Sequence, residues 1–135
     1  MKIRHFKDLI VWQLSSQLSK EIFQLTKTFP KSEKYALTSD IIRAARSIPS
    51  NIAEGFGRYH FSEQIQFYNI SKGSLLEVQN HLEEAKNIDY ISEDVKLNYY
   101  KRYHVVEVKL NKLIASTARA RKQYKNETKK KKSDK

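Results

Sequence analysis

The sequence has no cysteine, only two prolines and three glycines among 135 residues, and no long hydrophobic run. The lack of cysteine excludes disulfides and thiolate metal sites. No stretch approaches the roughly 18 apolar residues of a membrane-spanning helix, and the N-terminal residues lack the apolar core of a secretion signal. We therefore expect one soluble, cytoplasmic domain without a membrane partner.

One of the two prolines and two of the three glycines lie in one stretch, Ser47 to Arg58, which reads SIPSNIAEGFGR. Apolar residues run into and through it at steps of three and four, the spacing of a buried helix face: Leu37, Ile41, Ala45, Ile48, Ile52 and Phe56. Pro49 lies inside this pattern, and an interior proline costs about 3 kcal/mol unless the helix kinks. We predict a kinked but continuous helix that ends near Gly55 and Gly57.

Polar residues of the same helix lie opposite its apolar stripe. Asn51 and Glu54 are expected to bridge to a neighbouring subunit or to the next loop, together with Arg58. The alternative is a surface ion pair between Glu54 and Arg58, worth only a few tenths of a kcal/mol.

A first helix is expected over residues 7–28, with two apolar sides. One side holds Ile10, Leu14, Leu18, Ile22, Leu25 and Phe29, and the other holds Leu9, Trp12 and Phe23. Because only one side can face the core of a small bundle, we predict that Leu9, Trp12 and Phe23 form a subunit contact. The alternative is that Trp12 only covers one end of the core.

Two further helices follow by the same periodicity. The third carries Phe67, Ser71, Ser74, Val78, Leu82 and Ala85, and the fourth carries Val95, Tyr99, Tyr103, Val106, Leu110, Leu113 and Thr117. The small Ser71 and Ser74 are expected to pack against Trp12 or Phe23. Ser32, Ser62 and Ser92 are the predicted N-caps of the last three helices. The sequence predicts an all-α, antiparallel up-down-up-down four-helix bundle over residues 1–118.

The basic residues are unevenly distributed. Residues 119–135 hold nine of the 26 Lys and Arg and two of the 15 acidic residues, so this tail carries +7 and residues 1–118 carry +4. A run such as Lys129 to Lys132 cannot bury enough apolar surface to repay ordering, and we expect a disordered basic tail. A solubilising tail and a nonspecific polyanion-binding arm are equally compatible with this composition.

Catalytic chemistry has little support in the sequence. Neither Gly-x-x-x-x-Gly-Lys-Ser/Thr nor Gly-x-Gly-x-x-Gly is present. The nearest metal-ligand candidates, Glu77 with His81 and Glu84, and His104 with Glu107, have the wrong order and spacing for a bundle metal site. His81 and Glu84 are also expected to face water. We predict no enzyme activity, metal or cofactor.

Basic residues beside aromatic ones favour nucleic-acid binding, because such a surface combines phosphate contacts with base stacking. Tyr59 and Phe61 adjoin Arg58 in the expected loop. The predicted binding residues are Arg43, Arg46, Arg58, Lys72, Arg119, Arg121 and Lys122. Without a sequence-reading motif, binding of RNA or DNA should have low sequence specificity. The competing hypothesis is a scaffold that binds a protein partner.

The stretch from Ser47 to Arg58 resembles the signature of four-helix-bundle proteins encoded in intervening sequences of bacterial 23S ribosomal RNA genes. Residues 6–12 (FKDLIVW), Phe29-Pro30, Leu37-Thr38 and residues 72–75 (KGSL) agree with it in order. The resemblance covers roughly residues 6–116. It implies a bundle that assembles as a ring, a homopentamer, and it extends to retroelement accessory proteins that bind nucleic acid through a basic surface.

Overall fold

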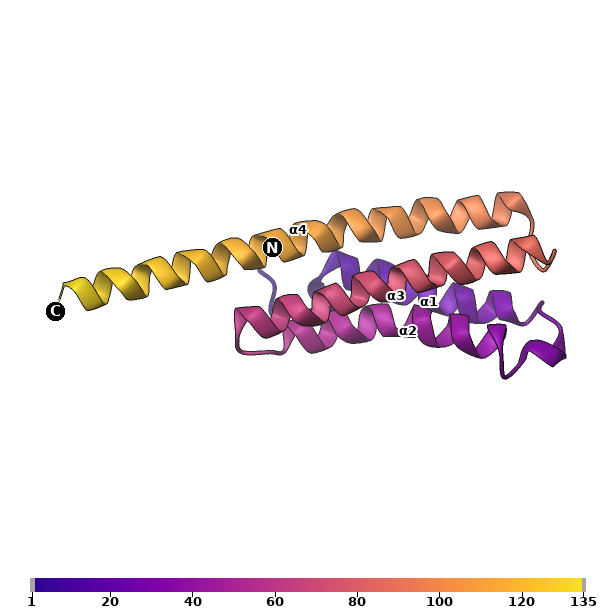
Figure 1. Ribbon diagram of the computed structural model, residues 1–135, viewed down its shortest axis with the longest axis horizontal. Helices are drawn as coiled ribbons and strands as arrows, with labels where there is room; N and C mark the ends of the chain where they lie inside the picture. Colours follow the sequence, from indigo (N-terminus) through magenta and orange to yellow (C-terminus); the bar gives the residue numbers. More distant parts are fainter. Residues whose placement is uncertain (1, 135) are drawn as a thin grey trace.

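The computed structural model describes residues 2–134, which contain four α-helices, two short 3₁₀ helices and no strand. The elements are η1 (Phe6–Asp8), α1 (Ile10–Thr26), η2 (Lys31–Glu33), α2 (Leu37–Phe56), α3 (Phe61–Asn87) and α4 (Glu93–Ser133). Each α-helix packs against its neighbours in the chain, and α1 also contacts α4 (Figure 1). These contacts close an up-down-up-down bundle, which confirms the predicted fold class.

The core contains the apolar stripes of α2, α3 and α4 largely as predicted. Its largest fully buried side chains include Ile22, Ile41, Ile48, Ile52, Leu75, Leu82, Tyr103 and Leu110. The prediction for α1 is wrong at Ile10, which is exposed, because the buried face is centred on Val11, Leu18 and Ile22. This face also buries Ser15, whose hydroxyl donates to the Trp12 carbonyl oxygen at 3.1 Å. This hydrogen bond offsets the free-energy cost of removing the hydroxyl from water.

Small polar residues join α3 to α2 around the interior proline. Pro49 lies within the continuous helix α2, as predicted. The Ser71 hydroxyl donates to the Ile48 carbonyl oxygen at 2.8 Å, and the Ser74 and Ser47 hydroxyls are also 2.8 Å apart. The expectation that the serines of α3 pack against aromatic residues of α1 is therefore wrong, because their hydroxyls find polar partners on α2 instead.

Two glycines of α2 have different roles at the end of the helix. A Cβ on Gly55 would lie 2.7 Å from Cε1 of the buried Tyr68, so this glycine permits close packing of α2 on α3. Gly57 is the C-cap of α2, which agrees with the predicted end of the helix. The Tyr68 ring thus occupies the space that a larger residue at position 55 would need.

Only one of the three predicted serine caps is correct. Ser92 accepts a hydrogen bond from the Val95 N–H at 3.2 Å and caps α4. Ser32 lies within η2, because a 3₁₀ turn fills the space after Pro30 before α2 begins. Ser62 lies in the first turn of α3, and its hydroxyl accepts a hydrogen bond from an Arg121 guanidinium nitrogen at 3.2 Å.

The predicted disorder of the basic tail is not confirmed, because α4 continues without a break to Ser133 and projects beyond the bundle (Figure 1). Residues 119–133 contain no glycine or proline and are rich in Lys and Arg, which favour helix. Cations near a helix C-terminus also interact favourably with the helix dipole. The composition indicates correctly that this segment has no hydrophobic core of its own. It can still be helical, because it extends a helix that is already formed inside the bundle and so avoids the cost of nucleation.

Candidate nucleic-acid interface

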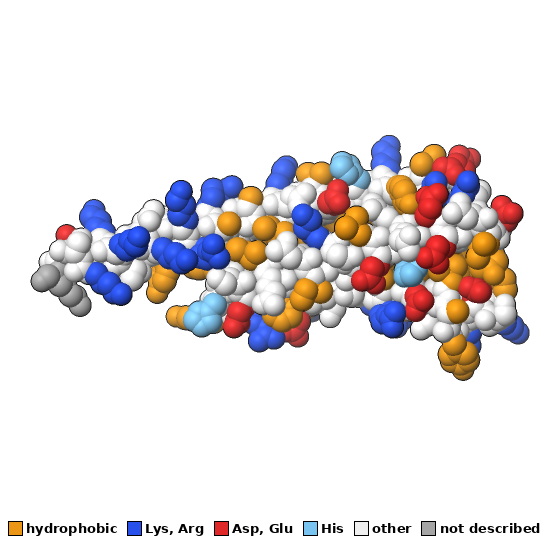
Figure 2. All heavy atoms as spheres, in the orientation of Figure 1, with side chains coloured by type: hydrophobic (Ala, Val, Ile, Leu, Met, Phe, Trp, Pro, Cys, Tyr) orange, Lys and Arg blue, Asp and Glu red, His pale blue; other side chains and the backbone are white. Residues whose placement is uncertain are grey.

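The projecting part of α4 is the most basic surface of the protein. Thr117 is the last buried residue of the helix, and we call residues 119–133 the α4 extension. The extension carries eight Lys or Arg and one acidic residue, Glu127. Among residues 2–134, no ion pair involves any of these eight basic side chains. Figure 2 shows mainly blue side chains along this helix. No carboxylate of residues 2–134 therefore pairs with this positive charge.

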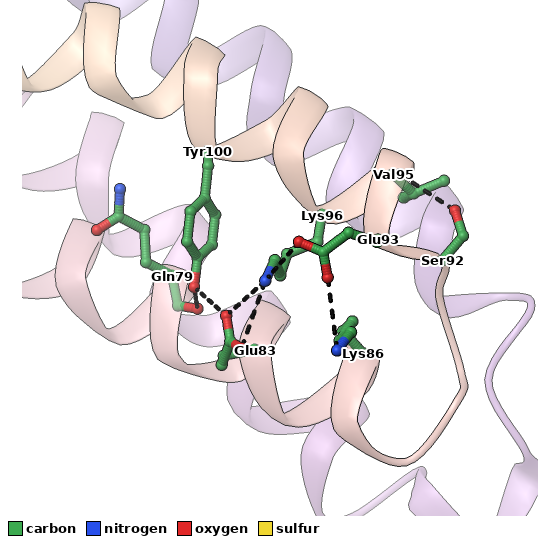
Figure 3. A network of polar contacts seen from close by, with 8 residues as sticks. All are labelled: Gln79, Glu83, Lys86, Ser92, Glu93, Val95, Lys96 and Tyr100. Carbon is green, nitrogen blue, oxygen red and sulfur yellow. Dashed lines mark hydrogen bonds and ion pairs between the residues drawn. The ribbon is translucent and has the colours of Figure 1, made fainter.

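At the opposite end of the bundle, Lys86 and Lys96 are paired with carboxylates (Figure 3). Lys96 Nζ lies 2.9 Å from a Glu93 oxygen and 3.1 Å from a Glu83 oxygen, and Lys86 also pairs with Glu93 at 3.5 Å. The Tyr100 hydroxyl lies 2.9 Å from a Glu83 oxygen. Hydrogen bonds from Lys96 and then Tyr100 lower the pKa of Glu83. This cluster leaves little positive charge for a polyanion.

The first turn of α3, which directly follows the turn at residues 57–60, lies against the first turns of the α4 extension. Arg121 reaches Ser62, and the rings of Tyr124 and Phe61 meet edge to face with centroids 6.1 Å apart. The structure therefore brings the predicted loop residues and the predicted tail residue Arg121 to one surface. Sequence reasoning missed Tyr124, although it is the one aromatic residue in the basic tail.

Two adjoining hollows mark this surface. The first has a volume of about 420 Å³ and is lined by Tyr59, His60, Phe61 and Tyr124. The second has a volume of about 360 Å³ and is lined by Ala118, Arg121, Lys122, Lys125, Asn126 and Lys129. Arg121 links the two hollows, because it lines the basic one and donates to Ser62, the residue after Phe61 of the aromatic one.

Arg58 precedes Tyr59 in the chain but lines neither hollow, and its charge is paired with a carboxylate. Its guanidinium lies 4.7 Å from the centroid of the Phe67 ring and 3.3 Å from a Glu54 oxygen. The ion pair that the sequence left as an alternative is thus present within one chain. Asn51 donates to the carbonyl oxygen of Ser47 at 2.8 Å. A bridge from Asn51 and Glu54 to a neighbouring subunit stays a prediction.

Arg43 and Arg46 lie on a different surface, because 15 positions along α2 separate Arg43 from Arg58, or about 22 Å. They line a groove of about 660 Å³ between α1 and α2, together with Phe23, Lys27 and Lys34. The Arg46 guanidinium lies 5.5 Å from the Phe23 ring centroid. Arg43 pairs with Asp40 at 3.1 Å. The predicted binding residues therefore divide between two surfaces.

The remaining predicted residues lie outside both hollows. Lys72 is half-buried on α3, while Arg119 is exposed on α4. Leu9 and Trp12 are half-buried and pack against the core, and the Trp12 ring lies 5.1 Å from that of Phe6. Phe23 is exposed. A subunit contact through Leu9, Trp12 and Phe23 stays a prediction.

Two of the four histidines, His81 and His104, each lie near a single carboxylate. His81 Nδ1 lies 3.6 Å from a Glu84 oxygen, and His104 Nδ1 lies 3.6 Å from a Glu107 oxygen. His81 is half-buried rather than exposed, which corrects the expectation that it faces water. Within residues 2–134, no group of three or more His, Asp or Glu is placed to hold a metal ion. None of the helices described is long and apolar enough to span a membrane.

Comparison with solved structures supports the fold. A crystal structure from Bacteroides thetaiotaomicron, described as a protein with unknown function from the S23 ribosomal protein family, superimposes with a TM-score of 0.58. The two chains are 19% identical, and the match covers 84% of this chain and 99% of the other. No curated protein sequence matches the chain.

Residues 7–112, which include α1 to α3 and most of the part of α4 that packs in the bundle, match the 23S rRNA-intervening sequence protein family. This range agrees with the motifs around Pro49 that suggested the same family from the sequence. The chain belongs to the 23S rRNA-intervening sequence protein family.

Proposed function

We propose that this protein binds nucleic acid, RNA or DNA, through the α4 extension, and that it does so as a homo-oligomeric ring without catalysing a reaction. One observation carries the proposal. Eight basic residues lie on a helix that projects from the bundle, and in the described chain none of them has a carboxylate partner. Such a surface attracts a phosphate backbone without reading its sequence.

The dimensions of the extension suit a polyanion. Fifteen helical residues span about 22 Å, a length along which a nucleic-acid duplex presents about a dozen phosphate charges. Several of the eight Lys and Arg side chains can therefore contact phosphates at once. Affinity that arises in this way depends steeply on salt, because each contact releases counterions.

A protein partner fits the extension less well. A helix that docks in a protein groove needs apolar residues at i, i+3, i+4 and i+7. Between Arg119 and Ser133 the larger apolar side chains are limited to Tyr124, which already packs against Phe61. The charge on the extension and its lack of an apolar stripe both favour nucleic acid over a scaffold role.

Assembly into a ring would multiply weak contacts. Several copies of the extension on one particle raise the effective concentration of basic groups at a bound strand. Exposed apolar side chains on the bundle, among them Phe23, Ile10 and Val105, supply surface for contacts between copies. The homopentamer implied by the family resemblance is one ring that would serve this purpose.

The test is binding of a structured RNA and of duplex DNA across a salt series. The variant Lys129→Gln, Lys130→Gln, Lys131→Gln should weaken both complexes and reduce the slope of log affinity against log salt by about 2 to 3. The control removes three positive charges from the bundle by Lys20→Gln, Lys31→Gln and Lys101→Gln, all of them exposed and unpaired. It should keep most of the affinity.

Equal losses in the two variants would assign binding to overall charge instead of the extension. Wild-type protein that binds neither nucleic acid at low salt, and that purifies without retained nucleic acid, would refute the proposal. The search would then move to protein partners. Arg43→Ala with Arg46→Ala tests whether the groove between α1 and α2 is a second contact surface.

A further inference from the structure

We propose that the hollow lined by Tyr59, His60, Phe61 and Tyr124 accepts an unpaired nucleic-acid base, so that the protein prefers single-stranded or looped segments over duplex. This inference rests on the proposed function and specifies its ligand. The hollow, which we call the aromatic pocket, combines four ring side chains from two distant parts of the chain. Its neighbours on α4 are basic.

The aromatic pocket presents ring surface to solvent. Tyr59 is 89% exposed and Tyr124 is 61% exposed, so neither ring is required to fill the core. The rings are nevertheless held in place. Tyr59 and His60 meet edge to face with centroids 5.1 Å apart, and Phe61 meets Tyr124 in the same manner. Aromatic rings that are exposed and also oriented form a platform on which a base can stack.

The backbone that carries these rings is fixed at both sides of the pocket. Gln64 Nε2 donates to the Arg58 carbonyl oxygen at 2.8 Å and so closes the turn before Tyr59. The Arg121 guanidinium donates to Ser62 at 3.2 Å and ties the extension to the start of α3. The backbone beneath the rings is therefore positioned before any ligand arrives, which reduces the entropic cost of binding.

Phosphate-binding groups lie where a strand leaving the pocket would pass. The basic hollow of about 360 Å³ contains Arg121, Lys122, Lys125 and Lys129. Arg121 lies three residues before Tyr124, at a spacing that makes the two side chains neighbours on one side of α4. A base stacked on Tyr124 would thus have its own phosphates next to cations, the combination found in proteins that bind single strands.

Duplex bases cannot use this pocket, because they are already stacked and paired with one another. A duplex can contact the α4 extension only through its phosphates. A single strand can use the same phosphate contacts and also the pocket. We therefore assign the difference in affinity between single strand and duplex to the aromatic residues of the pocket. The affinity common to both ligands is assigned to the Lys and Arg residues of the extension.

The experiment uses a short oligouridylate with one central 2-aminopurine, free or annealed to its complement. Binding to the full-length protein should quench the 2-aminopurine fluorescence of the single strand and favour that strand over the duplex. Tyr59→Leu and Tyr124→Leu should each weaken single-strand binding, from about fivefold to about a hundredfold, and leave duplex binding unchanged. Both positions are exposed, so the fold should survive.

Tyr35→Leu is the matched control, because Tyr35 is 87% exposed but lies before α2, away from the pocket. It should bind as the wild type does. If the two pocket variants bind the single strand like the wild type, or if duplex binds as tightly as single strand, the inference is wrong while the proposed function stands. If the wild type binds neither form at low salt, the proposed function itself fails.

Discussion

Arg102 on α4 and Glu21 on α1 form a bidentate ion pair, in which two guanidinium nitrogens donate to both carboxylate oxygens. The pair crosses the contact between the first and the last helix of the bundle. The hydrogen bond from Arg102 lowers the pKa of Glu21. Both side chains are partly exposed, so solvent limits what the pair contributes.

Arg102→Met should lower the free energy of unfolding by about 1 kcal/mol at neutral pH. The folded-state pKa of Glu21 lies below its unfolded value near 4.5, so the stabilisation is present above that pH and is lost as the pH falls through the folded pKa. Urea unfolding of wild type and variant should therefore converge in acid. Arg119→Met, which removes an unpaired arginine, should change stability little, and a constant difference at all pH values would contradict the assignment.

Gly55→Ala should destabilise the protein by about 1 to 3 kcal/mol, because the new Cβ would clash with the buried Tyr68 ring. Gly73→Ala is the matched control, since a Cβ there meets no atom within 4 Å. This second change should stabilise the chain by about 0.5 to 1 kcal/mol through helix propensity. Thermal unfolding of both variants measures the contrast, and two stabilising results would show that Tyr68 can move aside.

Lys129→Glu should raise the helical content of the α4 extension at low salt. Lys125 and Lys129 are spaced i to i+4, and like charges at this spacing destabilise a helix by a few tenths of a kcal/mol. The change converts that repulsion into an attraction. Far-UV circular dichroism should show the gain, and added salt should reduce it; Lys101→Glu makes the same charge change within the bundle and should show neither effect.

Phe23→Glu should lower the oligomeric mass in light scattering and leave helical content intact, if copies of the chain meet through this side of α1. The exposed ring lies 5.2 Å from Lys27 Nζ, so a carboxylate here gains a cationic neighbour and the fold should tolerate it. Tyr59→Glu places the same charge on an exposed aromatic position away from this groove and should not change the mass. An unchanged mass for Phe23→Glu would remove it from the proposed interface.

Periodicity predicted the bundle well where one stripe of large apolar residues faces the core, as in α2 and α4. On α1 it was wrong at Ile10, and it did not predict the burial of Ser15 and Thr26, whose hydroxyls donate to backbone carbonyl oxygens of their own helix. A pattern based on apolar residues alone does not predict that a serine or threonine can be buried when its hydroxyl bonds to the backbone. The packing of Ser71 and Ser74 on α3 was also missed, because their hydrogen-bond partners lie on another helix, α2.

The candidate interface was predicted only in pieces. The sequence indicated Arg58 with its aromatic neighbours and, separately, the basic tail. It did not indicate that Tyr124 meets Phe61, because the two residues are 63 positions apart and their contact depends on how α4 leaves the bundle. Composition also favoured disorder for a segment whose helix is continuous with one that the core supports.

The continuity of α4 from the core to Ser133 makes the basic segment a rod instead of a tether. A tether samples every direction within its reach and can capture a strand in any pose. A rod points one way, so the axis of the bundle fixes the direction from which a strand can be engaged. In an assembly of several copies, the geometry of the bundle contacts, and not linker length, would then set the angles between bound segments and the curvature that they impose on a nucleic acid.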